Sequence, residues 1–289
     1  MPPSASGEPP DFVAVGHLTV DELAGGLRPG GSVLYAGLLA HRQGLRVGLL
    51  TSHGPDFPLE VLPPGIEVVA LPAEATTRFA LDYTPRGRRL TLRARATPLG
   101  PAALPPHFAE AGLAYLAPVA DEVSPQLAGA FPDAAVGAGA QGWCRVWDRV
   151  GTVTMRPWPD PEPVLRRIQA LFLSSDDVAG WAGEALELYQ HVPLGALTFA
   201  EKGAMLFVNG ERHRVAPAPA VEVEPTGAGD VFAAAFLIRY NATGDPWDAA
   251  AFAAVAGALT VEGEGIAGVP TRERLLERWR ALTRSPSPF

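Results

Sequence analysis

Residues 224–230 read Glu-Pro-Thr-Gly-Ala-Gly-Asp and lead directly into an apolar helical pattern. A glycine-rich turn lets backbone N–H groups converge with no side chain between them, and the start of a helix adds the positive end of its dipole. A carboxylate beside such a turn repels an anion, so Asp230 makes sense as a base facing a hydroxyl that attacks a bound phosphoryl group. The alternative is a capping residue of the helix. The predicted anion-binding turn consists of Thr226, Gly227, Ala228 and Gly229.

This string resembles the second signature of the PfkB (ribokinase-like) family of carbohydrate and nucleoside kinases, usually written D-T-G-A-G-D, with Pro225 before Thr226 here. Residues 16–21 resemble the family's opening strand with its sugar-binding Asp. Residues 29–32 resemble its Gly-Gly turn into the first helix, and residues 263–271 are similar to its tail. These matches follow one another in the expected order, so the resemblance implies a kinase.

The whole chain shows the pattern of an α/β protein, because short apolar runs alternate with helical patterns. The resemblance implies a ribokinase-like fold: a central, mostly parallel sheet flanked by helices, with a small β-sheet lid. We expect a disordered leader over residues 1–10 and one kinase domain over residues 11–289. The lid segments are expected at about 11–28 and 76–97, where Thr76–Tyr83 and Arg89–Thr97 flank a turn and residues 11–27 supply a companion strand.

Composition excludes several classes of protein. The net charge of −8 argues against a nucleic-acid partner, and the longest apolar runs are too short to span a membrane. A single cysteine, Cys144, rules out an internal disulfide and is typical of the reducing cytoplasm. An NAD-binding oxidoreductase is disfavoured because no G-x-G-x-x-G follows the first strand.

Elements are expected at the following residues. The strands are 12–15, 46–51, 66–71, 114–118, 134–136, 171–173 and 196–199. The helices are 31–42, 161–169, 178–189, 230–239, 247–260 and 272–282.

The acceptor site is predicted near the N-terminus. Asp21 follows an apolar strand, where a carboxylate can accept hydrogen bonds from sugar hydroxyls; a capping or turn residue is the alternative. Gly30 and Gly31 let a substrate approach the backbone or form only a tight turn. Tyr35 stands where many sugar kinases of the family have Asn, which shifts the expected substrate away from ribose. Two further candidates, Gln141 to bind substrate and Arg145 to steady the phosphate, lie in a segment that reads equally as a surface turn.

The donor site is predicted from three further segments. Residues 198–203 resemble the family's T-x-G-x-x-G turn at the nucleotide, with Ala200 in place of the first glycine, so the backbone there must avoid positive φ or bear strain. Ser174 and Asp177 align with the family's N-x-x-E element, which implies a role in ordering Mg²⁺; a helix N-cap is equally compatible. The nucleotide-binding candidates are Ser174, Thr198, Lys202, Gly203, Thr226 and Gly257.

These features predict an ATP-dependent phosphotransferase that acts on a hydroxyl of a small sugar, nucleoside or polyol. The implied cofactors are ATP and Mg²⁺, with a monovalent cation such as K⁺ as a further candidate. The alternative is a non-catalytic sugar- or nucleotide-binding homologue of the same fold. An exposed lid edge would permit a homodimer.

Overall fold

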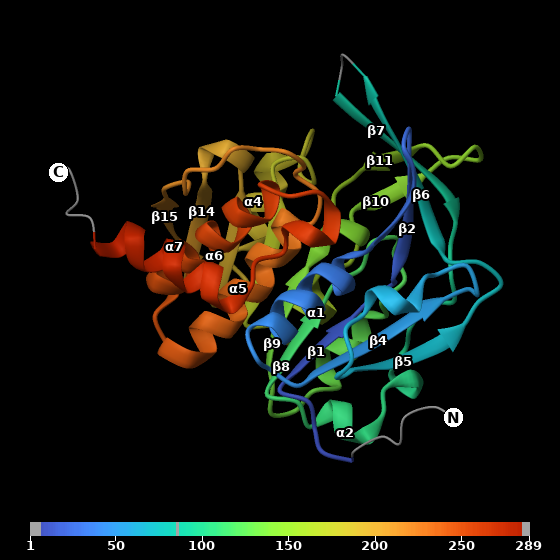
Figure 1. Cartoon of the computed structure of the whole chain (residues 1–289), viewed down its shortest axis with the longest axis horizontal. Coiled ribbons are helices and arrows are strands. Elements are labelled where there is room, and N and C mark those ends of the chain that lie inside the picture. The colour runs from blue at the N-terminus through green and yellow to red at the C-terminus, as the bar shows by residue number, and fades with distance from the viewer. Residues whose placement is uncertain (1–6, 85–86, 285–289) are drawn as a thin grey trace.

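The protein was analysed as a computed structural model that describes residues 7–84 and 87–284 (Figure 1). Within these residues the main sheet has nine strands in the order β15-β14-β13-β12-β9-β8-β1-β4-β5. Their bounds are β1 Phe12–Val15, β4 Val47–His53, β5 Ile66–Pro72, β8 Leu113–Leu116, β9 Ala135–Gly139, β12 Ala170–Ser174, β13 Leu194–Thr198, β14 Ala204–Val208 and β15 Glu211–Val215.

The sheet is parallel from β13 to β5, whereas β14 and β15 run antiparallel at one edge. Successive residues of β1 pack on opposite faces: Phe12 and Ala14 lie in one apolar cluster, and Val13 and Val15 in the other. A strand covered on both faces needs a continuous apolar run, which is what residues 12–15 provide. The predicted α/β fold class is confirmed.

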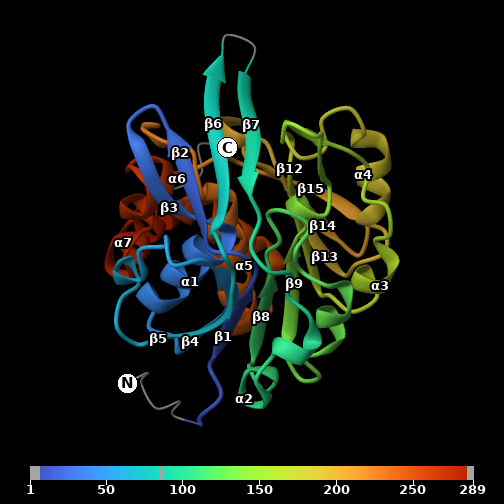
Figure 2. The ribbon, with the colours of Figure 1, turned by 90° about the vertical axis from the view of Figure 1, so that its right-hand side faces the viewer.

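Helices cover both faces of the sheet (Figure 2). The cluster on one face is built with residues of α1, α5, α6 and α7, and the cluster on the other with residues of α2, α3 and α4. The bounds are α1 Ser32–Arg42, α2 Pro106–Ala109, α3 Glu162–Leu165, α4 Ala182–Leu188, α5 Ala228–Thr243, α6 Pro246–Val261 and α7 Arg272–Arg284. None of the helices in the described part of the chain is long and apolar enough to cross a membrane.

A second sheet, which we call the lid, rises beyond one end of the main sheet (Figure 2). Its order is β3-β2-β6-β7, with bounds β2 Thr19–Leu23, β3 Gly26–Gly30, β6 Thr77–Thr84 and β7 Gly87–Ala94. The tip of the β6–β7 hairpin, residues 85–86, lies outside the described residues. A short hairpin, β10 (Arg145–Trp147) and β11 (Val153–Met155), packs beside β7 through Leu92 N–H and the Gly151 carbonyl.

Several expectations about individual elements need correction. Residues 11–27 do not form one companion strand, because 12–15 belong to the centre of the main sheet and 19–30 form the β2–β3 hairpin. The helices expected over 161–169 and 178–189 are shorter; Gly180, with φ of +89°, precedes α4 and delays its start to Ala182. The β14–β15 hairpin was missed, although Asn209 and Gly210 turn it with positive φ. Of the expected leader, residues 1–6 lie outside the described residues.

Candidate active site

The predicted site residues come together where the parallel strands end, beneath the lid. Gln141 follows β9, Ser174 ends β12 and Thr198 ends β13. Asp230 in the first turn of α5 is hydrogen-bonded by Tyr115, the next-to-last residue of β8. The register places Ser174 directly beside Thr198. The carboxyl ends of parallel strands meet at one edge of a sheet, which is where ligands bind in open α/β folds.

The turn before α5 has the geometry that its glycines predict. Gly227 has φ of +80°, and a Cβ at this position would lie 2.2 Å from Cδ1 of Tyr35, so only glycine fits. A Cβ on Gly229 would meet nothing within 4 Å, which leaves open space beside the first turn of the helix. No side chain caps α5, whose N-cap is Gly227. A small anion therefore has room to approach the start of α5.

Asp230 is the third residue of α5 and is half-buried. Its carboxylate is hydrogen-bonded by the hydroxyls of Ser32, the first residue of α1, and Tyr115 of β8. Gly139 makes room for this arrangement, because a Cβ there would lie 2.4 Å from the Tyr115 hydroxyl oxygen. Asp230 is thus held by side chains from two other elements and does not cap its own helix.

The surroundings of Asp230 raise its pKa from 3.8 to about 6. Burial is the main cause, and the nearby charge of Asp177 adds to it, because both disfavour the ionised carboxylate. The hydrogen bonds from Ser32 and Tyr115 and the charge of Arg145 act in the opposite direction. At pH 7 most of the population is ionised, so Asp230 is able to accept a proton.

Arg145 lies in the interior and Gln141 is half-buried, so this segment is not a surface turn. Arg145 is 9% exposed, and the intervening Trp143 is 3% exposed and stacks on Trp158 with ring centroids 4.7 Å apart. Arg145 Nη2 donates to Gln141 Oε1 at 2.7 Å, and Gln141 Nε2 donates to Ser32 Oγ at 2.8 Å. Both candidates therefore connect to the partner of Asp230 by hydrogen bonds within the protein.

The acceptor-side candidates gather around Tyr35. Asp21 lies in strand β2, so it is not a helix cap, and its Oδ1 accepts a hydrogen bond from Thr19 Oγ1 at 3.3 Å. A Cβ on Gly30 would lie 2.7 Å from Asp21 Oδ2, so glycine makes room for the carboxylate. Burial, followed by the charges of Asp21, Glu224 and Asp230, raises the pKa of the Tyr35 phenol. The phenol therefore stays neutral among several carboxylates.

Gly31 allows a backbone conformation that a residue with a side chain could not adopt here. Its φ is +102°, and a Cβ would lie 2.5 Å from the His17 carbonyl oxygen. Gly31 is the N-cap of α1 and thus sets the position of Ser32. The requirement for glycine here is steric and conformational.

An ion pair joins the lid to the segment before the anion-binding turn. Arg28 Nη1 of β3 donates to Glu224 Oε2 at 2.8 Å, and the same oxygen accepts from Gly265 N at 2.9 Å. Arg28 Nη2 also lies 3.5 Å from Glu264 Oε2. This contact could not be predicted, because Arg28 and Glu224 lie 196 residues apart in the chain.

Most donor-side candidates of this group lie in the turn between β13 and β14, whereas Gly257 lies in α6. Ala200 has φ of +50°, so the residue that replaces the expected glycine bears backbone strain. Gly203, with φ of +87°, cannot carry a side chain, because a Cβ would lie 2.3 Å from the Val215 carbonyl oxygen. Lys202 is exposed beside it. Gly257 packs against α5, where a Cβ would lie 3.5 Å from the carbonyl oxygen of Ala228.

The oxygen atoms near the end of β12 offer a limited set of ligands for a magnesium ion. Asp177 Oδ2 accepts hydrogen bonds from Ser174 N at 2.8 Å and Ser174 Oγ at 2.7 Å. Among the described residues no group of three or more His, Cys, Asp or Glu side chains could hold a metal ion. These residues suit Mg²⁺ that arrives with phosphates and keeps much of its water, the usual mode for this ion.

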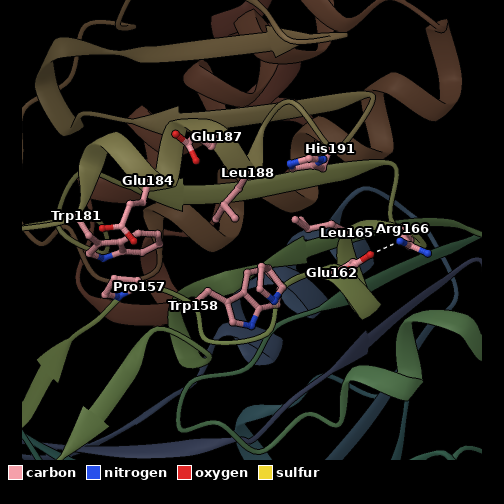
Figure 3. Close-up of a pocket in the computed structure, with 11 residues that line it drawn as sticks. Pro157, Trp158, Glu162, Leu165, Arg166, Trp181, Glu184, Glu187, Leu188 and His191 are labelled. Carbon is pink, nitrogen blue, oxygen red and sulfur yellow. Dashed lines mark hydrogen bonds and ion pairs between the residues drawn. The ribbon is translucent and has the colours of Figure 1, made fainter.

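A cavity of about 620 Å³ lies away from these residues (Figure 3). Trp158, Trp181, Leu165 and Leu188 line it together with Glu162, which is ion-paired to Arg166. It contains no candidate catalytic residue. Two of its tryptophans contact residues near the site: Trp158 stacks on Trp143, and Trp181 Nε1 donates to the Asp177 carbonyl at 3.0 Å.

Residues 165–272, which include the turn and Asp230, match the pfkB family of carbohydrate kinases. The predicted resemblance to the PfkB family is confirmed. No curated protein sequence matches the chain significantly.

The fold of this PfkB-like chain is shared with solved ribokinase-family kinases. A pyrophosphate-dependent kinase of that family, complexed with a pyrophosphate analog and myo-inositol, superposes with a TM-score of 0.77 at 22% identity over 92% of this chain and 99% of the other. Ribokinase from Thermotoga maritima gives 0.73 at 17% identity over 93% and 99%. Arabidopsis thaliana ribokinase, complexed with ribose and ATP, gives 0.69 at 17% identity over 94% and 99%. The family and these neighbours are kinases, in agreement with the predicted enzyme class.

Proposed function

We propose that the chain is a phosphotransferase that moves the terminal phosphoryl group of ATP to a hydroxyl of a small sugar, nucleoside or polyol. The observation that carries this proposal is the placement of Asp230. It is a half-buried carboxylate with pKa raised to about 6, within the glycine-rich first turn of α5. A base beside an anion site has a clear purpose when a hydroxyl attacks a bound phosphoryl group.

Each part of the site has a proposed role. The 226–229 turn and the start of α5 bind the transferring phosphoryl group through backbone N–H groups and the helix dipole. Asp230 accepts the proton of the attacking hydroxyl, and Asp21 with Tyr35 orients the acceptor. The residues around Thr198, Lys202, Gly203 and Gly257 receive the donor. Mg²⁺ beside Ser174 and Asp177 would neutralise phosphate charge when bound, and a K⁺ requirement is a further expectation.

The lid is proposed to cover the acceptor and exclude water, which otherwise competes with the acceptor hydroxyl. In this proposal residues 11–289 form one kinase domain, and its lid is the β3-β2-β6-β7 sheet, within residues 19–30, 77–84 and 87–94. A homodimer through the exposed lid edge and a location in the cytoplasm complete the proposal. Size-exclusion chromatography with light scattering tests the dimer.

The direct test is phosphoryl transfer with purified protein. Acceptors should include ribose, other sugars, nucleosides and myo-inositol, each offered with Mg²⁺ and either ATP or pyrophosphate, since relatives of both donor types share the fold. ³¹P NMR of the product identifies the phosphorylated hydroxyl. Turnover with one acceptor and ATP supports the proposal in full. Turnover only with pyrophosphate corrects the donor and retains the chemistry.

The second candidate is a non-catalytic homologue that binds a sugar or nucleotide. The strained Ala200 and the short Asp177 side chain are the observations that favour it. Thermal-shift stabilisation by ligands without any turnover across the panel would establish this alternative.

The acceptor role of Asp21 is tested by Asp21→Ala. Loss of a charged hydrogen bond to the acceptor should cost about 1.5–3 kcal/mol, which corresponds to about a 10- to 150-fold rise in the acceptor KM. The donor KM should stay within about twofold. Glu22→Ala, at the exposed neighbouring position of the same strand, is the matched control. An unchanged acceptor KM would exclude Asp21 from the acceptor site.

A further inference from the structure

A chain of hydrogen bonds links the lid-facing side of the core to Asp230. Arg145 of β10 donates from Nη1 to the Val119 carbonyl at 2.8 Å and from Nη2 to Gln141 Oε1 at 2.7 Å. Gln141 Nε2 then reaches Ser32 Oγ at 2.8 Å. The Ser32 hydroxyl in turn bonds to the carboxylate of Asp230.

The chemistry of Arg145 fixes the direction of every bond in this chain. A guanidinium only donates, so the amide oxygen of Gln141 must face Arg145 and its NH₂ must face Ser32. Ser32 Oγ therefore accepts from Gln141 and turns its single hydrogen toward Asp230. The carboxylate only accepts, so the chain is consistent from end to end while Asp230 is ionised.

The same guanidinium touches the lid. Its central carbon lies 5.4 Å from the ring centroid of Phe79, which is on lid strand β6. Phe79 is 4% exposed and packs with Val119, whose carbonyl accepts from Arg145. A cation over an aromatic face is attracted to it, so the lid contributes to holding Arg145 in place.

We infer that Arg145 and Gln141 are positioning residues that act through Ser32 to aim the Asp230 carboxylate, and that Phe79 makes this aim depend on the seating of the lid. The inference rests on the proposed function, because it concerns the base of that reaction. Small displacements of a catalytic group cost large factors in rate, so a base whose orientation depends on the lid works best when the lid is seated. The result is a coupling between substrate enclosure and proton acceptance.

The decisive variant is Gln141→Glu, which keeps the size of the side chain and pairs its charge with Arg145. The carboxylate introduced at position 141 in this variant cannot donate a hydrogen bond to Ser32. It accepts the hydrogen of the Ser32 hydroxyl instead, so the carboxylate of Asp230 faces only the lone pairs of Ser32 Oγ. We expect kcat to fall about 10- to 100-fold, with both KM values within about threefold. Gln190→Glu, at an exposed glutamine far along the chain, is the matched control and should leave kcat unchanged. A kcat within threefold of wild type for Gln141→Glu would overturn the inference.

The lid end is tested by Phe79→Leu, which keeps an apolar side chain and removes the ring. We expect kcat to fall about three- to tenfold in the wild-type background and less than twofold when Gln141→Glu is already present. Leu81→Val changes the same lid cluster at a residue outside the chain and serves as the control. If the fold-loss of kcat in the double variant equals the product of the losses in Phe79→Leu and Gln141→Glu, the lid does not act through this chain of hydrogen bonds.

A readout without substrate separates this inference from the proposed function. In the wild-type background Gln141→Glu should lower the urea midpoint, because two carboxylates compete for one Ser32 hydrogen. In an Asp230→Asn background, Gln141→Glu should leave the urea midpoint unchanged. The amide NH₂ introduced at position 230 donates to Ser32 Oγ, and the Ser32 hydroxyl donates to the carboxylate introduced at position 141, so every hydrogen bond has a donor and an acceptor. Equal shifts in both backgrounds would overturn the chain, whatever the protein catalyses. Absence of turnover in the wild type, with this coupling present, would instead refute the proposed function.

Discussion

The two sides of the proposed site, the base side and the donor side, are built in opposite ways. On the base side, Asp230 is bound by Ser32 and Tyr115, and Ser32 is supported by Gln141 and Arg145. On the donor side, Lys202 is exposed, Gly229 borders open space, and Ala200 sits in a strained turn. A base must be aimed before the reaction, which favours a rigid hydrogen-bonded surround, whereas a donor must enter and leave, which favours an open one.

Asp230→Asn should give the largest effect, because it removes the proposed base and leaves the open donor side intact. Turnover should fall about 10²–10⁴-fold, the usual contribution of a general base. Donor affinity, measured by calorimetry, should hold or rise, because a negative charge beside the phosphates has gone. A comparable loss of turnover and of melting temperature would make Asp230 a structural residue.

The raised pKa of Asp230 predicts opposite pH dependences of activity and stability. The carboxylate accepts a proton only when ionised, so kcat/KM should fall about tenfold per pH unit below about 6. The folded pKa lies above the unfolded one, so the native state binds the extra proton and stability falls as pH rises from about 4 to about 6. The cost at neutral pH is about 1–3 kcal/mol for this half-buried group, and Asp230→Asn should recover part of it. Urea titrations at pH 5 and 7 measure the difference, and a pH-independent kcat/KM between 5 and 7 would contradict the assignment.

The residues of the proposed site could be nominated from the sequence, whereas the contacts between them could not. The T-G-A-G-D string and the order of the flanking segments led to Asp230, to Asp21 and to the parallel sheet, because those features depend on local turns and apolar periodicity. The contact of Tyr115 with Asp230 could not be predicted, since an aromatic residue in a buried strand ordinarily belongs to the hydrophobic core. Gln141 and Arg145 were noticed, but their contacts with Ser32 and Phe79 join residues more than 60 positions apart in the chain. The Arg28–Glu224 ion pair is of the same kind.

The two glycines of the anion-binding turn allow a matched comparison of fold and function. Gly227→Ala should destabilise the protein by about 1–3 kcal/mol, because φ of +80° is strained for alanine and the Tyr35 ring occupies the space. Gly229→Ala faces open space and should leave the urea midpoint nearly unchanged. Its methyl group should instead weaken donor binding by crowding the anion. Equal destabilisation by the two substitutions would contradict this division of roles.

Ala200→Gly should give the smallest change in stability and activity. It tests whether the backbone strain at Ala200 contributes to donor binding. Alanine at φ of +50° costs about 1–2 kcal/mol, whereas glycine adopts this conformation freely but loses more backbone entropy on folding. The net expectation is a gain in stability of about 0.5–1 kcal/mol, read as a higher urea midpoint. Because Ala200 lies in a turn and its side chain has no role in the proposed chemistry, kcat should stay within about twofold. A loss of stability would show that contacts of the Ala200 methyl group outweigh the strain, and a large fall in kcat would show that the strained turn itself holds the donor.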